Sequence, residues 1–229
     1  MTTFGLIHGG FHTAWSWGIL RDELEKRGHR VLTVDLPISD PAADPDVYLD
    51  ATAAAFGESP EPIVVVGHSI AGWTAMRVPD RVPVQGIIYL CSCINFPPGA
   101  YEGEPLPVIA ADPADWIPDE AGLITMTPEA ARRYFYHDVE PALADELISH
   151  LVRQAVTGIV GPASKPTLPA VPARYIKAND DQAVSAAWAT WAAPVLTGHE
   201  ALIVDGSHFP FLTRPKEVAD LFEQIVAEF

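Results

Sequence analysis

The stretch Ile63-Val64-Val65-Val66-Gly67-His68-Ser69-Ile70-Ala71-Gly72 decides the fold of this chain. Its apolar first half predicts a buried strand and its second half begins a helix, so Ser69 stands at the apex of the turn between them. Small residues beside such a serine let the strand and helix backbones approach closely, and a serine in this context can act as a nucleophile. Ala71 replaces the second glycine of the G-x-S-x-G pattern, so the match is imperfect. The alternative interpretation is that Ser69 only caps an ordinary helix.

Apolar, β-rich runs alternate with helix-like segments on both sides of this stretch. Because that alternation is typical of βαβ units, it predicts an α/β fold with a six-stranded, mostly parallel sheet and helices on both faces. Strands are expected at residues 4–8, 30–36, 63–66, 84–93, 173–178 and 201–204. Helices are expected at residues 15–27, 47–56, 70–78 and 215–229.

Residues 97–171 depart from this alternation, being rich in proline and acidic residues. Their clearest helix signal runs over residues 127–156, with a break near Pro141. An insertion of this length after a strand is more often a functional lid than a structureless loop. We therefore expect a core made of residues 1–96 and 172–229, and a small helical lid made of residues 97–171.

The end of the first predicted strand, Leu6-Ile7-His8-Gly9-Gly10, would leave backbone N–H groups free in the loop that follows. An enzyme of acyl transfer needs two N–H donors facing the developing oxyanion, typically one from this loop and one from the residue after the nucleophile. Gly10 and Ile70 occupy those two places. A glycine turn that simply joins a strand to a helix is the alternative interpretation.

Acid and base candidates follow the last two predicted strands. Asp180 and Asp181 come after the first of them, and His208 comes after the second. A serine nucleophile needs a neutral imidazole to take its proton and a buried carboxylate to orient that imidazole, and Ser, Asp, His is a known chain order for such a triad. Spacing alone does not choose between the two aspartates, whereas Asp205 is expected to cap a turn.

The charge of the chain is lopsided, with 30 Asp and Glu against 14 Lys and Arg and a net charge of -16. Such a surface repels phosphate and anionic lipid, so neither nucleic acid nor a membrane is expected as a partner. The start lacks a basic region before its apolar run, and a cytoplasmic location is expected. Cys91 and Cys93 are expected to be buried free thiols on one face of a strand, with no metal and no cofactor.

With these residues in view, the chain resembles the compact plant and bacterial branch of the α/β-hydrolase superfamily, which contains methylesterases, carboxylesterases and hydroxynitrile lyases. The likeness runs nearly end to end. It implies the α/β-hydrolase fold. It also implies that Asp181 is the carboxylate that orients the histidine. In this branch that aspartate lies six residues after an aromatic residue of the preceding strand, and the aromatic residue here is Tyr175. The motifs that carry the likeness are the serine turn, His8-Gly9-Gly10 with His12, Trp15-Ser16-Trp17, and Gly206-Ser207-His208-Phe209.

The resemblance also weighs esterase against lyase. The best-studied plant lyases of the branch carry threonine where this chain has Gly9, and lysine where it has Phe209. A lyase uses the charge of that lysine to stabilise departing cyanide, which a phenylalanine cannot do. Both positions therefore favour an esterase.

We expect a serine hydrolase that cleaves a small, fairly apolar carboxylic ester, of methyl ester or lactone type, through an acyl-enzyme on Ser69. The alternatives are non-hydrolytic chemistry (cofactor-independent oxygenation, cyclisation or a lyase) with His208 and Asp181 as the base, and a non-catalytic small-molecule binding protein. Either a monomer or a homodimer is compatible with the sequence. The residues expected around the substrate pocket are Gly9, His12, Trp116, Tyr134, Phe135 and Phe209.

Overall fold

A six-stranded sheet forms the centre of the computed structural model, which describes residues 1–97, 99–105, 107–159 and 161–229. The strand order is β2-β1-β3-β4-β8-β9, and all five neighbouring pairs are parallel. The fold class predicted from the alternating pattern is thus confirmed. The strands are β1 (Thr3–Ile7), β2 (Arg30–Val34), β3 (Ile63–His68), β4 (Val84–Leu90), β8 (Ala173–Ala178) and β9 (Leu202–Val204).

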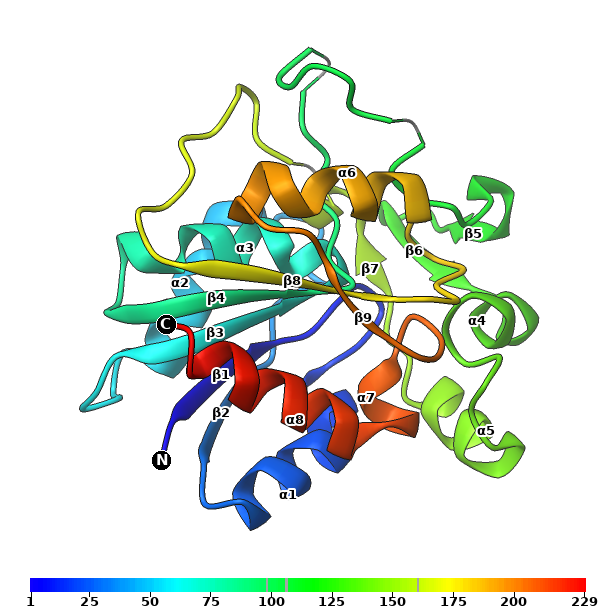
Figure 1. The fold of residues 1–229 in the computed structure, drawn as a ribbon. Coiled ribbons are helices and arrows are strands. Elements are labelled where there is room, and N and C mark those ends of the chain that lie inside the picture. Colours follow the sequence, from blue (N-terminus) through cyan, green and yellow to red (C-terminus); the bar gives the residue numbers. More distant parts are fainter. Residues whose placement is uncertain (98, 106, 160) are drawn as a thin grey trace.

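Helices cover both faces of this sheet (Figure 1). One face carries α1 (Gly18–Lys26) and α8 (Pro215–Val226), and the other carries α2 (Pro45–Phe56), α3 (Gly72–Arg77) and α6 (Ala186–Thr197). Short helical segments complete the core. These are the 3-10 turns Ala14–Trp17, Ser69–Ala71 and Val78–Asp80, and α7 (Pro210–Thr213).

The central strand β3 shows why its sequence is apolar without interruption. Val64 and Val66 are buried against the α1 and α8 side of the sheet, and Val65 is buried against the α2 and α3 side. A parallel strand covered on both faces buries every side chain, so the alternation of polar and apolar residues is absent.

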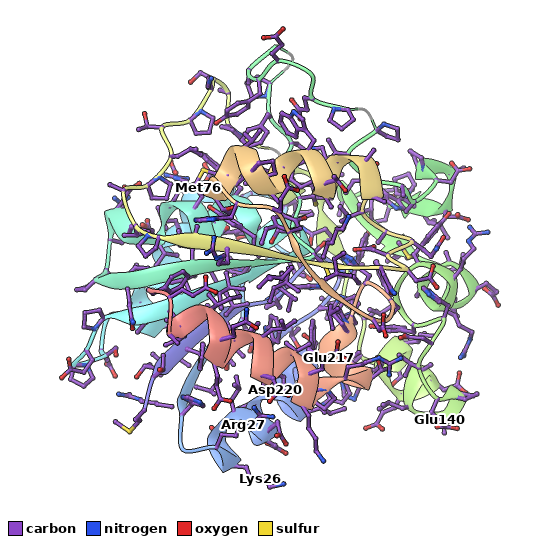
Figure 2. The ribbon with its side chains drawn as sticks, in the orientation of Figure 1. Lys26, Arg27, Met76, Glu140, Glu217 and Asp220 are labelled. Atoms are coloured by element: carbon purple, nitrogen blue, oxygen red, sulfur yellow. The ribbon has the colours of Figure 1, made fainter. Side chains whose placement is uncertain are left out.

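An ion-pair cluster joins the two helices of one face. Arg27, which follows the last residue of α1, points towards α8 (Figure 2). Its Nη1 atom lies 2.6 Å from Asp220 Oδ1 and 2.8 Å from Glu223 Oε2. The partners are partly exposed, so solvent weakens the attraction, and most of the stability of this face comes from the buried apolar stripe of α8.

The helices and strands of the inserted segment lie at the carboxyl ends of the parallel strands (Figure 1). The segment contains α4 (Pro128–Phe135) and α5 (Pro141–Ser149), so the predicted break near Pro141 is confirmed, but the helix ends at Ser149 and does not reach residue 156. Thr127 caps α4, because its side chain accepts from Ala130 N. The sequence predicts a purely helical lid, and the structure differs. The segment also holds a three-stranded antiparallel sheet and two 3-10 turns. Their bounds are β5 (Trp116–Pro118), β6 (Leu123–Met126), β7 (Gln154–Ala155), Pro113–Asp115 and Val156–Ile159. We call residues 97–171 the cap.

Both cysteines are buried free thiols, as predicted, but they do not share a face. Strand β4 ends at Leu90, and Cys91 has a φ of 46°, so the alternation of a regular strand stops before the pair. Cys91 packs on the α1 and α8 side of the sheet, and Cys93 on the α2 and α3 side. In the part of the chain that the structure describes, no helix is long and apolar enough to span a membrane.

Candidate active site

Ser69 lies at the sharp turn between β3 and α3, with 9% of its surface exposed. Its φ is 56°, a left-handed conformation that is unusual for a non-glycine residue. Such a strained conformation persists only where the surrounding structure holds it, and such residues cluster at functional sites. The turn depends on Gly67, where a Cβ would lie 2.6 Å from Ala75 Cβ and 2.9 Å from Ala71 O. Gly67 therefore lies where the strand and the helix are too close for a side chain, while Ala71 buries its methyl group in the core.

His208 follows β9 and forms a hydrogen bond with Asp181, which follows β8. His208 Nδ1 lies 2.8 Å from Asp181 Oδ2, and the side chains are 1% and 8% exposed. The other carboxylate oxygen of Asp181 accepts from Ala183 N at 2.8 Å and from Val184 N at 2.9 Å. A carboxylate held in this way fixes the direction of the imidazole, and His208 and Ser69 line the same cavity.

The two competing aspartates have other partners. Asp180 Oδ2 lies 3.0 Å from His137 Nε2, and its side chain is 60% exposed. Asp205 Oδ1 accepts from Asn179 Nδ2 at 2.6 Å. The choice that sequence spacing leaves open thus has a geometric answer, because Asp181 is the aspartate that contacts His208.

A cavity opens beside Ser69. Gly10 and Ile70, the residues expected to supply the oxyanion donors, both line it. Four of the expected pocket residues also line it, and the remaining walls are almost entirely apolar. The expected four are Gly9, Trp116, Phe135 and Phe209, and the others include Phe11, Ile109, Met126, Ile159 and Val184.

Two residues expected in the pocket lie outside its lining. His12 is turned away because its Nδ1 atom donates to Gly10 O at 2.6 Å, while its Nε2 atom accepts from the hydroxyl of Tyr136. The hydroxyl of Tyr134 in α4 donates to Asp115 Oδ2 at 2.7 Å, within the cap. The structure thus does not bring these two side chains to the lining of the cavity, and a sequence does not show which way a loop or cap side chain points.

Three further histidines surround the site, and all are buried. His8 accepts from Leu36 N at 3.0 Å, and His68 Nε2 donates to His208 O at 2.9 Å. Burial lowers the pKa of His8, lowers that of His68 well below its usual value, and lowers the pKa of His12 to about 3. These three imidazoles are therefore neutral at pH 7, and His208 is the one paired with a carboxylate.

Cys91 lies beside this pair, and potential ligand atoms of Cys91, Asp181 and His208 are within 4.8 Å of one another. A metal site would need the cysteine as a thiolate. Burial raises the pKa of the Cys91 thiol well above its ordinary value, and Asp181 and His208 already bond to each other. The three residues are thus a poor set of ligands for a metal ion.

Sequence reasoning missed one buried residue that holds the loop after β1. Gln154 in β7 accepts from Phe11 N at 3.4 Å through Oε1 and donates from Nε2 to the hydroxyl of Tyr48 at 3.2 Å. Phe11 itself has a φ of 63°. A lone glutamine in a two-residue strand has no pattern that identifies it in a sequence.

Comparison with known proteins places this geometry in a family. The model of the alpha/beta hydrolase family matches residues 6–221. The chain is 25% identical to Methylesterase 7 of Arabidopsis thaliana over 254 residues, which cover 99% of this chain and 96% of the relative.

Solved structures agree in fold. A methylesterase from Arabidopsis superposes with a TM-score of 0.78 at 19% identity, covering 100% of both chains. A pyrethroid hydrolase from Sphingobium faniae JZ-2 superposes with a TM-score of 0.76 at 23% identity, covering 100% of this chain and 99% of that one. The chain therefore belongs to the α/β hydrolase family and is a carboxylesterase-like enzyme within it.

Proposed function

We propose that this enzyme cleaves a small, apolar carboxylic ester through an acyl-enzyme on Ser69. The observation that carries the proposal is the buried hydrogen bond between His208 and Asp181 next to Ser69, at an apolar cavity. A serine hydroxyl is a poor nucleophile at neutral pH, so it needs such a base.

The proposed reaction gives each of these groups one role. His208 Nε2 takes the hydroxyl proton of Ser69 as the oxygen attacks the ester carbonyl, and Asp181 stabilises the imidazolium that results. The N–H groups of Gly10 and Ile70 stabilise the oxyanion. His208 then gives the proton to the leaving alcohol, and water activated by the same imidazole hydrolyses the acyl-enzyme.

The lining of the cavity supports one class of substrate. Its walls are mainly aromatic and aliphatic side chains, as in pockets that bind apolar small molecules. Because a charged acid would be poorly solvated there, we propose a methyl ester or a lactone with an apolar acyl part.

The position of Phe209 argues for an esterase and against a lyase. It is 1% exposed and packs among aromatic rings, its ring centre lying 4.4 Å from that of His12 and 4.5 Å from that of His68. This position places an apolar ring beside His208, where it offers no positive charge to a departing anion.

The test is turnover of p-nitrophenyl acetate by the wild type and by Ser69→Ala, with Ser149→Ala as a control in an exposed serine at the end of α5. We expect kcat of Ser69→Ala to fall by a factor on the order of 10⁴ or more, and the control to keep full activity. Turnover that survives in Ser69→Ala would contradict an acyl-enzyme on Ser69. A wild type that binds small esters without turning them over would support a binding protein.

A further inference from the structure

Four consecutive residues of the cap, Phe135-Tyr136-His137-Asp138, contact the three loops that carry the proposed catalytic groups. They lie where α4 ends and the chain turns, beside the loop that follows β9 (Figure 1). We call residues 135–138 the clamp segment.

The loop of the general base is held most firmly. Asp138 Oδ2 accepts from Ser207 N at 3.0 Å and from Thr213 Oγ1 at 3.2 Å. The carbonyl oxygen of Phe135 accepts from Ser207 Oγ at 3.0 Å. Since Ser207 directly precedes His208 and is fully buried, the clamp segment fixes the backbone from which the imidazole extends.

Gly206 fits the same contact. Its φ is 117°, and a Cβ at this position would lie 2.8 Å from Asp138 Oδ2. Glycine thus gives the carboxylate room to reach Ser207, and it permits a backbone conformation that other residues rarely adopt.

His137 and Tyr136, which lie between Phe135 and Asp138, contact the other two loops. His137 Nε2 lies 3.0 Å from Asp180 Oδ2, in the residue directly before Asp181. The hydroxyl of Tyr136 donates to His12 Nε2, and His12 in turn donates to Gly10 O at 2.6 Å. Three neighbouring side chains therefore connect to the base loop, the acid loop and the oxyanion loop.

We propose that the clamp segment is a positioning device that aligns these loops, with Asp138 as the positioning residue for His208. The inference rests on the proposed function, because it assigns a role to residues that support the same triad. Neither His137 nor Asp138 lines the cavity, so they act on the geometry of the base and not on substrate binding.

The test compares Asp138→Ala and Asp138→Asn with Asp145→Ala. Asp145 is a matched control, because it is an exposed cap carboxylate whose partner, Arg132, lies within the cap. We expect Asp138→Ala to lower kcat for p-nitrophenyl acetate on the order of 100-fold, because displacement of a catalytic group by about 1 Å has that cost. KM should stay unchanged. Asp138→Asn should recover most of the activity, because its amide oxygen still accepts from Ser207 N, and Asp145→Ala should match the wild type.

A second readout does not depend on turnover. The proton between His208 Nδ1 and Asp181 gives a low-field NMR resonance, which we expect to be sharp in the wild type and in Asp145→Ala, and broadened or lost in Asp138→Ala. Wild-type kcat together with an unchanged resonance in Asp138→Ala would overturn the clamp. An equal loss of kcat in Asp145→Ala would do so too. If the wild type itself lacks Ser69-dependent turnover, the proposed function fails, and the resonance still decides the clamp.

Discussion

Gly9 lies against Ser69 so closely that a Cβ on the glycine would be 2.9 Å from Ser69 Cβ. The same Cβ would be 2.9 Å from His68 Nδ1. Glycine at this position thus allows the loop after β1 to pack against the turn at Ser69.

Gly9→Ala should therefore destabilise the protein by about 1–3 kcal/mol, the usual cost of an extra methyl group in a filled space. Gly10→Ala is the matched comparison, since its Cβ would meet the flexible end of Ile70 at 3.1 Å. Urea denaturation should rank Gly9→Ala as the less stable of the two. The reverse ranking would mean that the turn adjusts more easily than its contacts indicate.

Asp181→Asn should lower kcat for p-nitrophenyl acetate by a factor on the order of 10⁴. The amide would still accept from Ala183 N and Val184 N, but its NH₂ group would face His208 Nδ1 and favour the wrong tautomer of the imidazole. Asp180→Asn is the control, and its kcat should stay near that of the wild type, because an asparagine does not reach His208 from this position and can still form a hydrogen bond with His137 Nε2. Equal losses in the two variants would contradict the role of Asp181.

Gly67→Ala should destabilise the fold, because the new methyl group would lie 2.6 Å from Ala75 Cβ and 2.9 Å from a backbone oxygen. We expect a loss of about 1–3 kcal/mol in the free energy of unfolding. Gly18→Ala is the opposite case, since no atom lies within 4 Å of its Cβ and its φ is helical at -48°. It should stabilise the protein by up to about 1 kcal/mol. Thermal unfolding of both variants checks the pair, and equal shifts would count against the packing argument.

Acid should weaken the fold through the buried histidines. The pKa values of His8, His12 and His68 are lowered in the native state, so below pH 6.5 the unfolded chain takes up protons that the native chain does not. The free energy of unfolding should therefore fall as pH falls, by about 1.4 kcal/mol per pH unit for each such histidine. For His12 this dependence should extend from pH 6.5 down to about 3.

His12→Gln tests that expectation directly. Its free energy of unfolding is measured by urea denaturation at several pH values below 6.5. It should fall less steeply with falling pH than that of the wild type, and the difference in slope should be about 1.4 kcal/mol per pH unit. His150→Gln is the control, because His150 is exposed and stacks on the half-exposed Trp15. An identical slope in the wild type and in His12→Gln would contradict the assignment.

The sequence predicts the core of this fold well, for physical reasons. Fully buried parallel strands such as β3 appear as continuous apolar runs, and the glycine-bounded turn at Ser69 has a recognisable pattern. Helix α6 was not predicted, because the solvent-facing positions of AAWATWAAPVLT are filled by alanine, threonine and proline and not by charged residues. A helix is recognised in a sequence by the contrast between its apolar face and its polar face, and that contrast is weak in α6.

The contacts between the cap and the core lie beyond sequence reasoning. The strands of the cap are two to four residues long, too short to show a period. Asp138 and Gln154 contact residues that are distant along the chain, and no local pattern marks such pairs. The same holds for His12 and Tyr134, whose hydrogen bonds turn them away from the pocket.

Capture of the acyl-enzyme tests the central claim most directly. The protein is mixed with excess p-nitrophenyl acetate, quenched with acid within the first turnovers, digested, and mapped by mass spectrometry. We predict an acetyl group on the peptide that carries Ser69, and no acetyl group on that peptide in Ser69→Ala. Release of p-nitrophenol by the wild type with no acetyl group on Ser69, or with the group on another residue, would contradict the account.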